Sequence, residues 1–110
     1  MAIYIRRRDV EGKPGEGHIS YGLLNEKHGC VAGCCTGISV YSLMEYAAPG
    51  IHADQEGFIV LEGTGWAIVG EEEFRLEPET SFIAPAGTPH RIRRDPDSVP
   101  VKVFWFHAAV

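Results

Sequence analysis

The hydrophobic residues of this chain fall into short runs that are separated by turn-forming residues. The runs are rich in Val, Ile, Phe, Tyr, Trp and Thr, which strands favour. Thirteen Gly and seven Pro are spread along the whole sequence, so few intervals could hold a helix of average length. The pattern predicts seven or eight short strands, at residues 3–7, 38–47, 57–61, 66–69, 72–76, 81–84, 90–94 and 101–107.

Turn signals lie close together between these runs. Residues 62–65 and 70–71 have the composition of β-hairpin turns. Short strands with such frequent turns are typical of an antiparallel sandwich or barrel, so we expect an all-β fold. Two stretches are less regular. Residues 10–37 are predicted to be extended and loop-like, and residues 42–48 also have the propensity for a short helix.

Polar residues that could carry chemistry gather in two stretches. In the first, His52 and Glu56 stand four residues apart, which is about 13 Å in one straight strand and too far for a shared ion. A turn at residues 53–55 would instead place them side by side on neighbouring antiparallel strands. In the second, residues 85–89 form a turn, stiffened by two Pro, that delivers His90 at the head of a strand.

Together, His52, Glu56 and His90 would form a face of two imidazoles and one carboxylate. This ligand set leaves coordination positions open and suits non-haem Fe(II) and related divalent ions. Each residue taken alone is more simply explained as an ordinary polar side chain. The hypothesis of a divalent metal site therefore depends on all three residues coming together.

These motifs resemble those of the cupin superfamily, over roughly residues 40–107. The family's first motif ends in His, three or four residues, Glu, six residues and Gly, and His52, Glu56 and Gly63 match it here. The second motif contains Pro-x-Gly, two residues and His, and the matching positions are Pro85, Gly87 and His90. The resemblance implies a double-stranded β-helix, or jelly-roll barrel, that binds a divalent ion such as Fe, Mn, Ni or Zn.

The chain also departs from the family pattern. Gly50 stands where the first motif has its first histidine, so the usual set of three His and one Glu is short by one ligand. The second motif has Glu79 for its opening Gly and Arg94 for its closing Asn. Water, substrate or another side chain could fill the vacancy, or the site could hold no metal. The side chains that could fill it are those of Asp54, His18, His28 and His107.

Alternation along the strands predicts what surrounds the ion. If Glu56 and His90 point inward, Phe58 follows on one strand, and Ile92 and Arg94 follow on the other. These last three are the predicted substrate-binding residues. An inward guanidinium is costly unless it meets a carboxylate, so Arg94 would pair with a protein acid or a ligand acid, or else lie beyond the pocket rim in solvent.

The last predicted strand, residues 101–107, is largely apolar on both faces. Lys102 alternates onto one side with Phe104 and Phe106, and Val103 onto the other side with Trp105 and His107. One face would pack inside the barrel and the other against a second sheet or subunit. We therefore expect a homodimer.

Length and charge narrow the classes of function. The 110 residues suit one domain, with the motif-bearing barrel at about 38–107 and a loop-rich extension at 1–37 that begins with a strand. The net charge of −5 has the wrong sign for binding a phosphate backbone, so no nucleic-acid partner is expected. No run of eighteen apolar residues is present, so no membrane span is expected. The first residues do not have the pattern of a secretory signal, which predicts a cytoplasmic protein.

The three cysteines add little to this. Cys30, Cys34 and Cys35 lack the paired spacing of a zinc knuckle and are interpreted as reduced side chains. A reactive pair of Cys30 with His28 is a remote alternative.

Two hypotheses of function remain. In the first, the ion polarises a small oxygen-rich or carboxylate-bearing molecule, which gives isomerase, lyase or dioxygenase chemistry. In the second, the chain is a non-catalytic module that binds a small molecule, with a degenerate or empty metal site. Metal content separates the two.

Overall fold

The computed structural model describes residues 2–108, which form nine strands and two short 3-10 helices, without an α-helix in that range. None of the described helices is long and apolar enough to cross a membrane. The 3-10 helices are η1 (Arg7–Asp9) and η2 (Glu26–His28). The strands are β1 (Lys13–Gly15), β2 (His18–Gly22), β3 (Cys35–Tyr41), β4 (Gln55–Glu62), β5 (Gly65–Val69), β6 (Glu72–Leu76), β7 (Ser81–Ala84), β8 (His90–Arg94) and β9 (Val101–Ala108).

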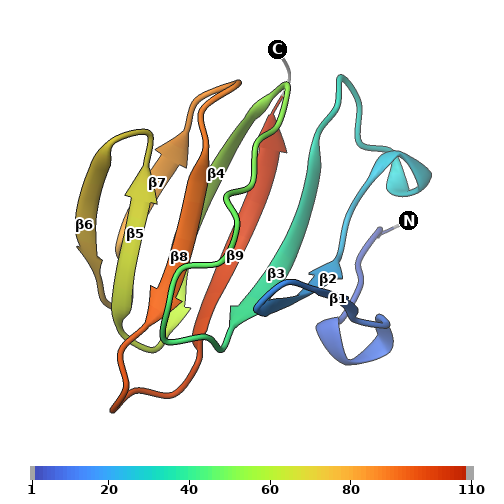
Figure 1. The fold of residues 1–110 in the computed structure, drawn as a ribbon. Coiled ribbons are helices and arrows are strands. Elements are labelled where there is room, and N and C mark those ends of the chain that lie inside the picture. The colour runs from blue at the N-terminus through green and yellow to red at the C-terminus, as the bar shows by residue number, and fades with distance from the viewer. Residues whose placement is uncertain (1, 109–110) are drawn as a thin grey trace.

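The strands form two antiparallel sheets that face each other (Figure 1). The larger sheet has six strands in the order β1-β2-β3-β9-β4-β7, and the smaller sheet has three in the order β6-β5-β8. Strands far apart in the sequence are neighbours, as β9 lies between β3 and β4. The predicted all-β jelly-roll class is confirmed.

Alternating residues of the strands build a core between the two sheets. Along β4, Phe58 and Val60 are buried, whereas the next outward residue, Leu61, is 47% exposed. Val101 and Val103 of β9 face them from the neighbouring strand. The other buried hydrophobic residues are Ala67, Leu76, Ala84 and Ile92. This cluster fills one end of the space between the sheets and holds the strands that carry the polar residues of the other end.

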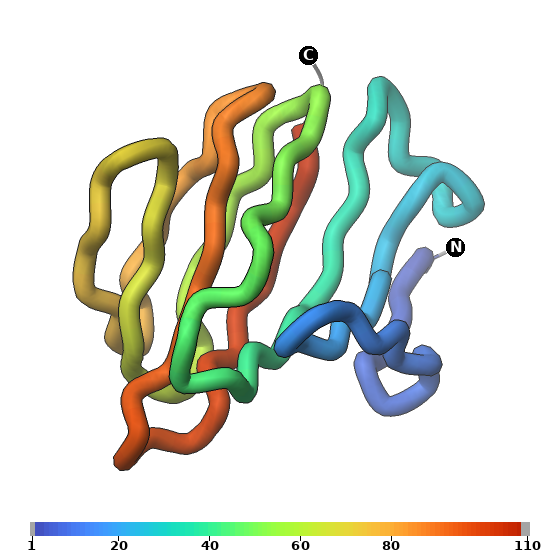
Figure 2. The backbone as a smooth tube through the Cα atoms, viewed as in Figure 1, coloured from blue at the N-terminus to red at the C-terminus, as the bar shows by residue number. Residues whose placement is uncertain are grey.

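Between β3 and β4, residues 42–54 run beside β8 without forming a strand (Figure 2). Gly50 and His90 exchange two backbone hydrogen bonds of 2.9 Å, and the Arg94 amide donates to the Leu43 carbonyl at 3.0 Å. The segment thus covers the free edge of β8. The predicted strand at 38–47 is correct only in its first part, because β3 ends at Tyr41, and the alternative helix is also absent.

The N-terminal part differs from the expectation in two ways. Residues 3–7 do not form a strand, and the Arg7 guanidinium lies over the Tyr21 ring, 4.3 Å from its centroid. Within residues 10–37, β1 and β2 form a hairpin that extends the larger sheet through pairing of β2 with β3. That pairing involves a partner strand distant in sequence, which local composition does not reveal.

Candidate metal centre

His52 and Glu56 come together because the chain turns between them. His52 lies near the end of the segment that runs beside β8, and Glu56 is the second residue of β4. The bend at Ala53 and Asp54 reverses the chain, so His52 Nε2 lies 3.1 Å from Glu56 Oε1. The predicted juxtaposition of these two side chains is confirmed.

His90 reaches the same point from the other motif. The preceding turn uses Gly87 at φ +75°, a conformation that favours glycine. The Gly87 amide donates to the His52 carbonyl at 2.8 Å, which ties the two motifs together directly. As the first residue of β8, His90 places its Nε2 3.4 Å from Glu56 Oε1.

The three residues form a candidate metal-binding group, because their donor atoms could together hold one ion. One donor atom from each of His52, Glu56 and His90 lies within 4.8 Å of the others. Glu56 and His90 are buried, whereas the His52 side chain is 42% exposed. Glu56 Oε1 is buried without any hydrogen-bond partner. A buried carboxylate oxygen that faces imidazole nitrogens without hydrogen-bonding them fits a shared cation.

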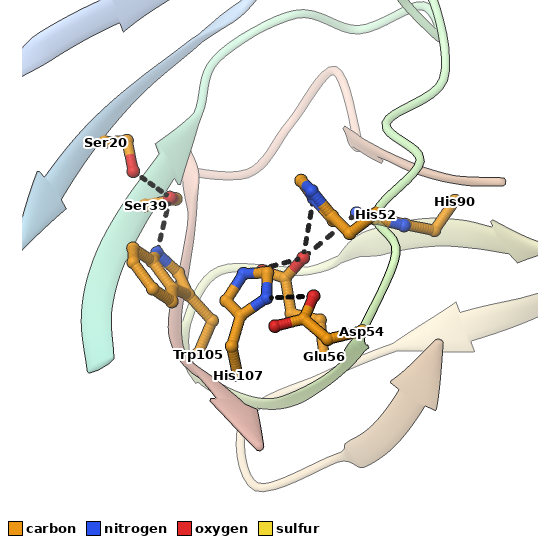
Figure 3. A network of polar contacts seen from close by, with 8 residues as sticks. All are labelled: Ser20, Ser39, His52, Asp54, Glu56, His90, Trp105 and His107. Atoms are coloured by element: carbon orange, nitrogen blue, oxygen red, sulfur yellow. Dashed lines mark hydrogen bonds and ion pairs between the residues drawn. The ribbon is translucent and has the colours of Figure 1, made fainter. Parts of the chain in front are cut away.

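His107 is the third imidazole beside Glu56 (Figure 3). Its Nε2 lies 3.6 Å from Glu56 Oε1, and its Nδ1 lies 2.8 Å from Asp54 Oδ1. This hydrogen bond from His107 holds the pKa of Asp54 below its usual range. Asp54 therefore remains an anion that fixes the His107 ring. From the sequence alone, Asp54 and His107 are only two of several candidates for the vacant ligand position.

The other two candidate histidines lie elsewhere. The His18 ring stacks on Tyr41, with 5.1 Å between ring centroids, in the wall of the cavity. His28 belongs to the capping box of η2, where its Nδ1 accepts a hydrogen bond from the Asn25 amide at 3.2 Å. The nearby cysteine Cys30 is a free thiol. Neither histidine belongs to the group of close donor atoms formed by His52, Glu56 and His90.

A cavity of about 300 Å³ opens beside the metal-binding group. It is lined by His52, Glu56 and His90 at one end, and its wall includes Tyr41, Trp105 and Ile92. Such a volume suits a small molecule. Ile92 is thus one predicted substrate-binding residue that does line the cavity.

The other two predicted substrate-binding residues have different surroundings. Phe58 is 1% exposed and stacks on Phe82, with 4.6 Å between ring centroids, so it belongs to the core behind His90. Arg94 donates from Nε to the Ser42 carbonyl at 2.8 Å, and from one terminal nitrogen to the carbonyls of Asp95 and Ser98 at 3.2 and 2.9 Å. Its guanidinium therefore joins loops, and neither residue is among those that line the cavity.

Polar groups on the wall opposite the smaller sheet form a chain. Trp105 Nε1 donates to Ser39 Oγ at 2.8 Å, and Ser39 Oγ donates to Ser20 Oγ at 3.1 Å (Figure 3). Burial, reinforced by the Glu56 charge, raises the pKa of Tyr41 far above its ordinary value. The Tyr41 hydroxyl thus stays protonated and able to donate to a ligand.

Comparison with known proteins found a matching family model. Residues 43–107, more than half of the chain, match the model of the family described as Cupin domain. No curated protein matches the chain. The match spans all three members of the metal-binding group and both motifs that deliver them.

Several solved structures have a similar fold. HppE, in its Fe(II) form with the alternative substrate (S)-1-HPP, gives a TM-score of 0.84 at 14% identity, over 97% of this chain and 60% of that one. Hydroxypropylphosphonic acid epoxidase from S. wedmorenis, in complex with fosfomycin, gives 0.80 at 14% identity, over 97% and 59%. Salicylate 1,2-dioxygenase from Pseudoaminobacter salicylatoxidans, with gentisate, gives 0.72 at 19% identity, over 88% and 26%. The chain spans at most 60% of these proteins, and at this identity the similarity shows the fold alone.

Proposed function

Because this chain belongs to the cupin family, we propose that it is a small metal-dependent cupin. In this proposal, His52, Glu56 and His90 hold a divalent ion, which is Fe, Mn, Ni or Zn. A small oxygen-rich or carboxylate-bearing molecule binds in the adjoining cavity. The solved structures with a similar fold include an Fe(II) protein and a dioxygenase, so iron is the first metal to test.

One observation carries the proposal. Glu56 Oε1 is buried, has no hydrogen-bond partner and is 3.1 Å from His52 Nε2 and 3.4 Å from His90 Nε2. Burying a carboxylate oxygen without a partner is costly. A divalent cation between the three donors removes that cost, which gives the arrangement a physical reason.

The bound ion would supply a Lewis acid that stabilises an enolate or oxyanion, or, as iron, a centre that activates dioxygen, giving isomerase, lyase or dioxygenase chemistry. The chain's own residues would position the substrate. Ile92 and Trp105 provide an apolar wall beside the donors, and the Tyr41 hydroxyl can donate a hydrogen bond to a substrate oxygen. Apolar contact on one side and a few polar groups on the other orient a small molecule.

Elemental analysis of the purified protein tests this function. Protein prepared without added ions should contain close to one equivalent of a transition metal. His52→Ala and His90→Ala should lose it, whereas His18→Ala, a change in the cavity wall outside the metal-binding group, should retain it. A metal-free protein that also fails to take up added Fe(II), Mn(II), Ni(II) or Zn(II) would instead support the non-catalytic binding module.

The homodimer is proposed from the outer face of the larger sheet. Ile38, Phe104 and Ile59 are directly paired across β3, β9 and β4 and point away from the core. Close to them, Phe106 is 39% exposed and Ile83 is 48% exposed. A contiguous apolar face of this kind is typical of an interface between subunits. Light scattering at micromolar concentration should give the mass of a dimer for the wild type and the mass of a monomer for Phe106→Glu. A monomeric wild type would refute the proposal.

The cytoplasmic location likewise remains a proposal. Cys30, Cys34 and Cys35 are free thiols in the structure, and free thiols persist in reducing compartments. Fractionation of cells that express the native gene should place the protein with the soluble cytoplasmic fraction. Recovery outside the cytoplasm would contradict it.

A further inference from the structure

The position of the missing family ligand faces the metal-binding group but offers no donor atom. Gly50 pairs with His90 through two backbone hydrogen bonds. A Cβ atom on Gly50 would lie 3.1 Å from His90 Nε2. A side chain there would therefore point at the coordinating nitrogen of His90. The vacancy identified from the sequence is a real one in the structure.

His107 approaches the metal-binding group from the larger sheet. It is the direct partner of Glu56 in the pairing of β9 with β4, so the two side chains stand next to each other on the inner face. His107 Nε2 lies 3.6 Å from Glu56 Oε1. The His107 ring also meets the His52 ring edge-on, with 4.8 Å between centroids.

Asp54 determines which ring nitrogen of His107 carries the proton and which carries the free lone pair. A carboxylate only accepts hydrogen bonds, so its 2.8 Å contact with His107 places a proton on Nδ1. In the neutral ring this assignment leaves the lone pair on Nε2, the nitrogen that faces Glu56. Histidine ligands to metals usually have their other ring nitrogen fixed by such a partner.

We propose that His107 is the fourth protein ligand of the metal ion and that Asp54 is its positioning residue. The proposal rests on the proposed function, because it presupposes a metal held by His52, Glu56 and His90. Glu56 Oε1 is surrounded by three Nε2 atoms at 3.1, 3.4 and 3.6 Å. Ligand atoms that each lie about 2.1 Å from one ion are roughly 3.0–3.5 Å apart when adjacent. The distances from Glu56 Oε1 to the His52 and His90 nitrogens are those of a shared ion, and the distance to the His107 nitrogen is slightly longer.

The three imidazoles are not equivalent. The tightest group of donors consists of His52, Glu56 and His90, and His107 stands outside it. We therefore expect His107 to be the most weakly held and most exchangeable of the four ligands. It comes from β9, an inner strand of the larger sheet, whereas His90 comes from β8 in the smaller sheet, so His107 belongs to neither of the two family motifs.

Counting the imidazoles on a bound metal tests the proposal. Pulsed EPR of the Cu(II)-loaded protein detects the remote nitrogen of each coordinated imidazole. We expect three imidazoles in the wild type and two in His107→Ala and His107→Gln, while His18→Ala keeps three. Circular dichroism of each variant checks that the fold is intact. His107→Gln is included because Gln fills more of the space of the lost ring than Ala does.

The metal affinity of Asp54→Asn tests the positioning role. This variant should keep three imidazoles but bind the metal about tenfold to a hundredfold more weakly. An unchanged affinity would overturn the role of Asp54. Two imidazoles in both wild type and His107→Ala would overturn the fourth ligand while leaving the proposed function intact. A wild type whose metal binding does not depend on His52 and His90 would overturn both.

Discussion

The space between the two sheets has two ends that are built from the same strands. Along β4, the inward residues pass from Glu56 to Phe58 and then Val60, and the latter two are almost fully buried. Along β9, they pass from Val103 at the apolar end to His107 at the polar end. The apolar end is sealed, whereas the polar end adjoins the cavity.

This difference separates stability from chemistry. The sealed end buries apolar side chains and so provides the hydrophobic stabilisation of the fold. The open end buries a carboxylate oxygen without a hydrogen-bond partner, which costs free energy unless a cation is bound. The packed apolar side chains at the sealed end therefore hold the strands rigid. The same strands present, at the open end, buried polar groups that lower stability. Substitutions at the sealed end should mainly lower stability, whereas substitutions at the open end should mainly weaken metal binding.

The largest effect on stability is expected from Phe58→Ala at the sealed end. The Phe58 ring is 1% exposed and stacks on Phe82, so removing it leaves a cavity. The free energy of unfolding should fall by about 3–5 kcal/mol, measured by urea denaturation. Leu61→Ala, at a position of the same strand that is 47% exposed, is the control and should cost less than half as much. Equal losses would mean that the core does not lie where we place it.

Metal binding should stabilise the open end. At a free metal concentration of one hundred times Kd, the free energy of unfolding should rise by about 2.7 kcal/mol. For a domain of this size, the melting temperature should rise by about 10 °C. Thermal melts with added metal and with a chelator measure this. A melting temperature that does not respond to the metal would contradict the account.

Asp95 should give a smaller effect, which depends on pH. Its carboxylate accepts hydrogen bonds of 2.9 Å from the Thr64 hydroxyl and from the Arg75 guanidinium, and the guanidinium holds the pKa of Asp95 below its usual range. A carboxyl group with a lowered pKa in the folded state stabilises the protein above its unfolded pKa of about 3.9, and this contribution is lost as the pH falls below that value.

Asp95→Asn should therefore lower the free energy of unfolding at pH 7 by about 1–2 kcal/mol. The loss stays small because Arg75 is half-exposed and solvent screens its charge. The difference from the wild type should shrink as the pH falls below about 4, measured by denaturant titration at each pH. Asp97→Asn, in the exposed turn that follows, is the control. A difference that stays constant down to pH 3 would show that the ion pair is not its source.

The smallest effect on stability is expected from Glu56→Gln in the presence of a chelator. The amide carries no charge to bury and can donate hydrogen bonds to the neighbouring imidazoles. The metal-free variant should be as stable as the wild type or more stable by up to about 1 kcal/mol. In the same variant, the stabilisation by metal should disappear. A variant that is clearly less stable than the metal-free wild type would contradict a cost at the open end.

The sequence predicted the strands from β4 to β9 well, because their apolar residues alternate between turns that contain Gly or Pro. It failed for β1 and β2, where Pro14 and Gly15 weaken the local signal and the strand depends on its pairing with β3. For residues 3–7, β-branched and aromatic residues suggested a strand, but the segment finds no partner strand in the described fold.

The candidate site was predictable where a local turn creates it. The bend after His52 and the turn before His90 are both determined by residues next to them in the sequence. The contact of Asp54 with His107 is not, since it joins residues 53 positions apart through the pairing of β4 with β9. The alternation of side chains along β8 correctly predicted that Ile92 lines the cavity. It could not show that Arg94, at the end of β8, would donate hydrogen bonds to backbone carbonyls.

The most direct test is the anomalous diffraction of a crystal of the metal-loaded protein at the absorption edge of the metal. We predict one strong peak about 2.0–2.2 Å from His52 Nε2, His90 Nε2 and a Glu56 carboxylate oxygen. A peak bound elsewhere, or no peak among these three residues in a crystal shown by fluorescence to contain the metal, would contradict it.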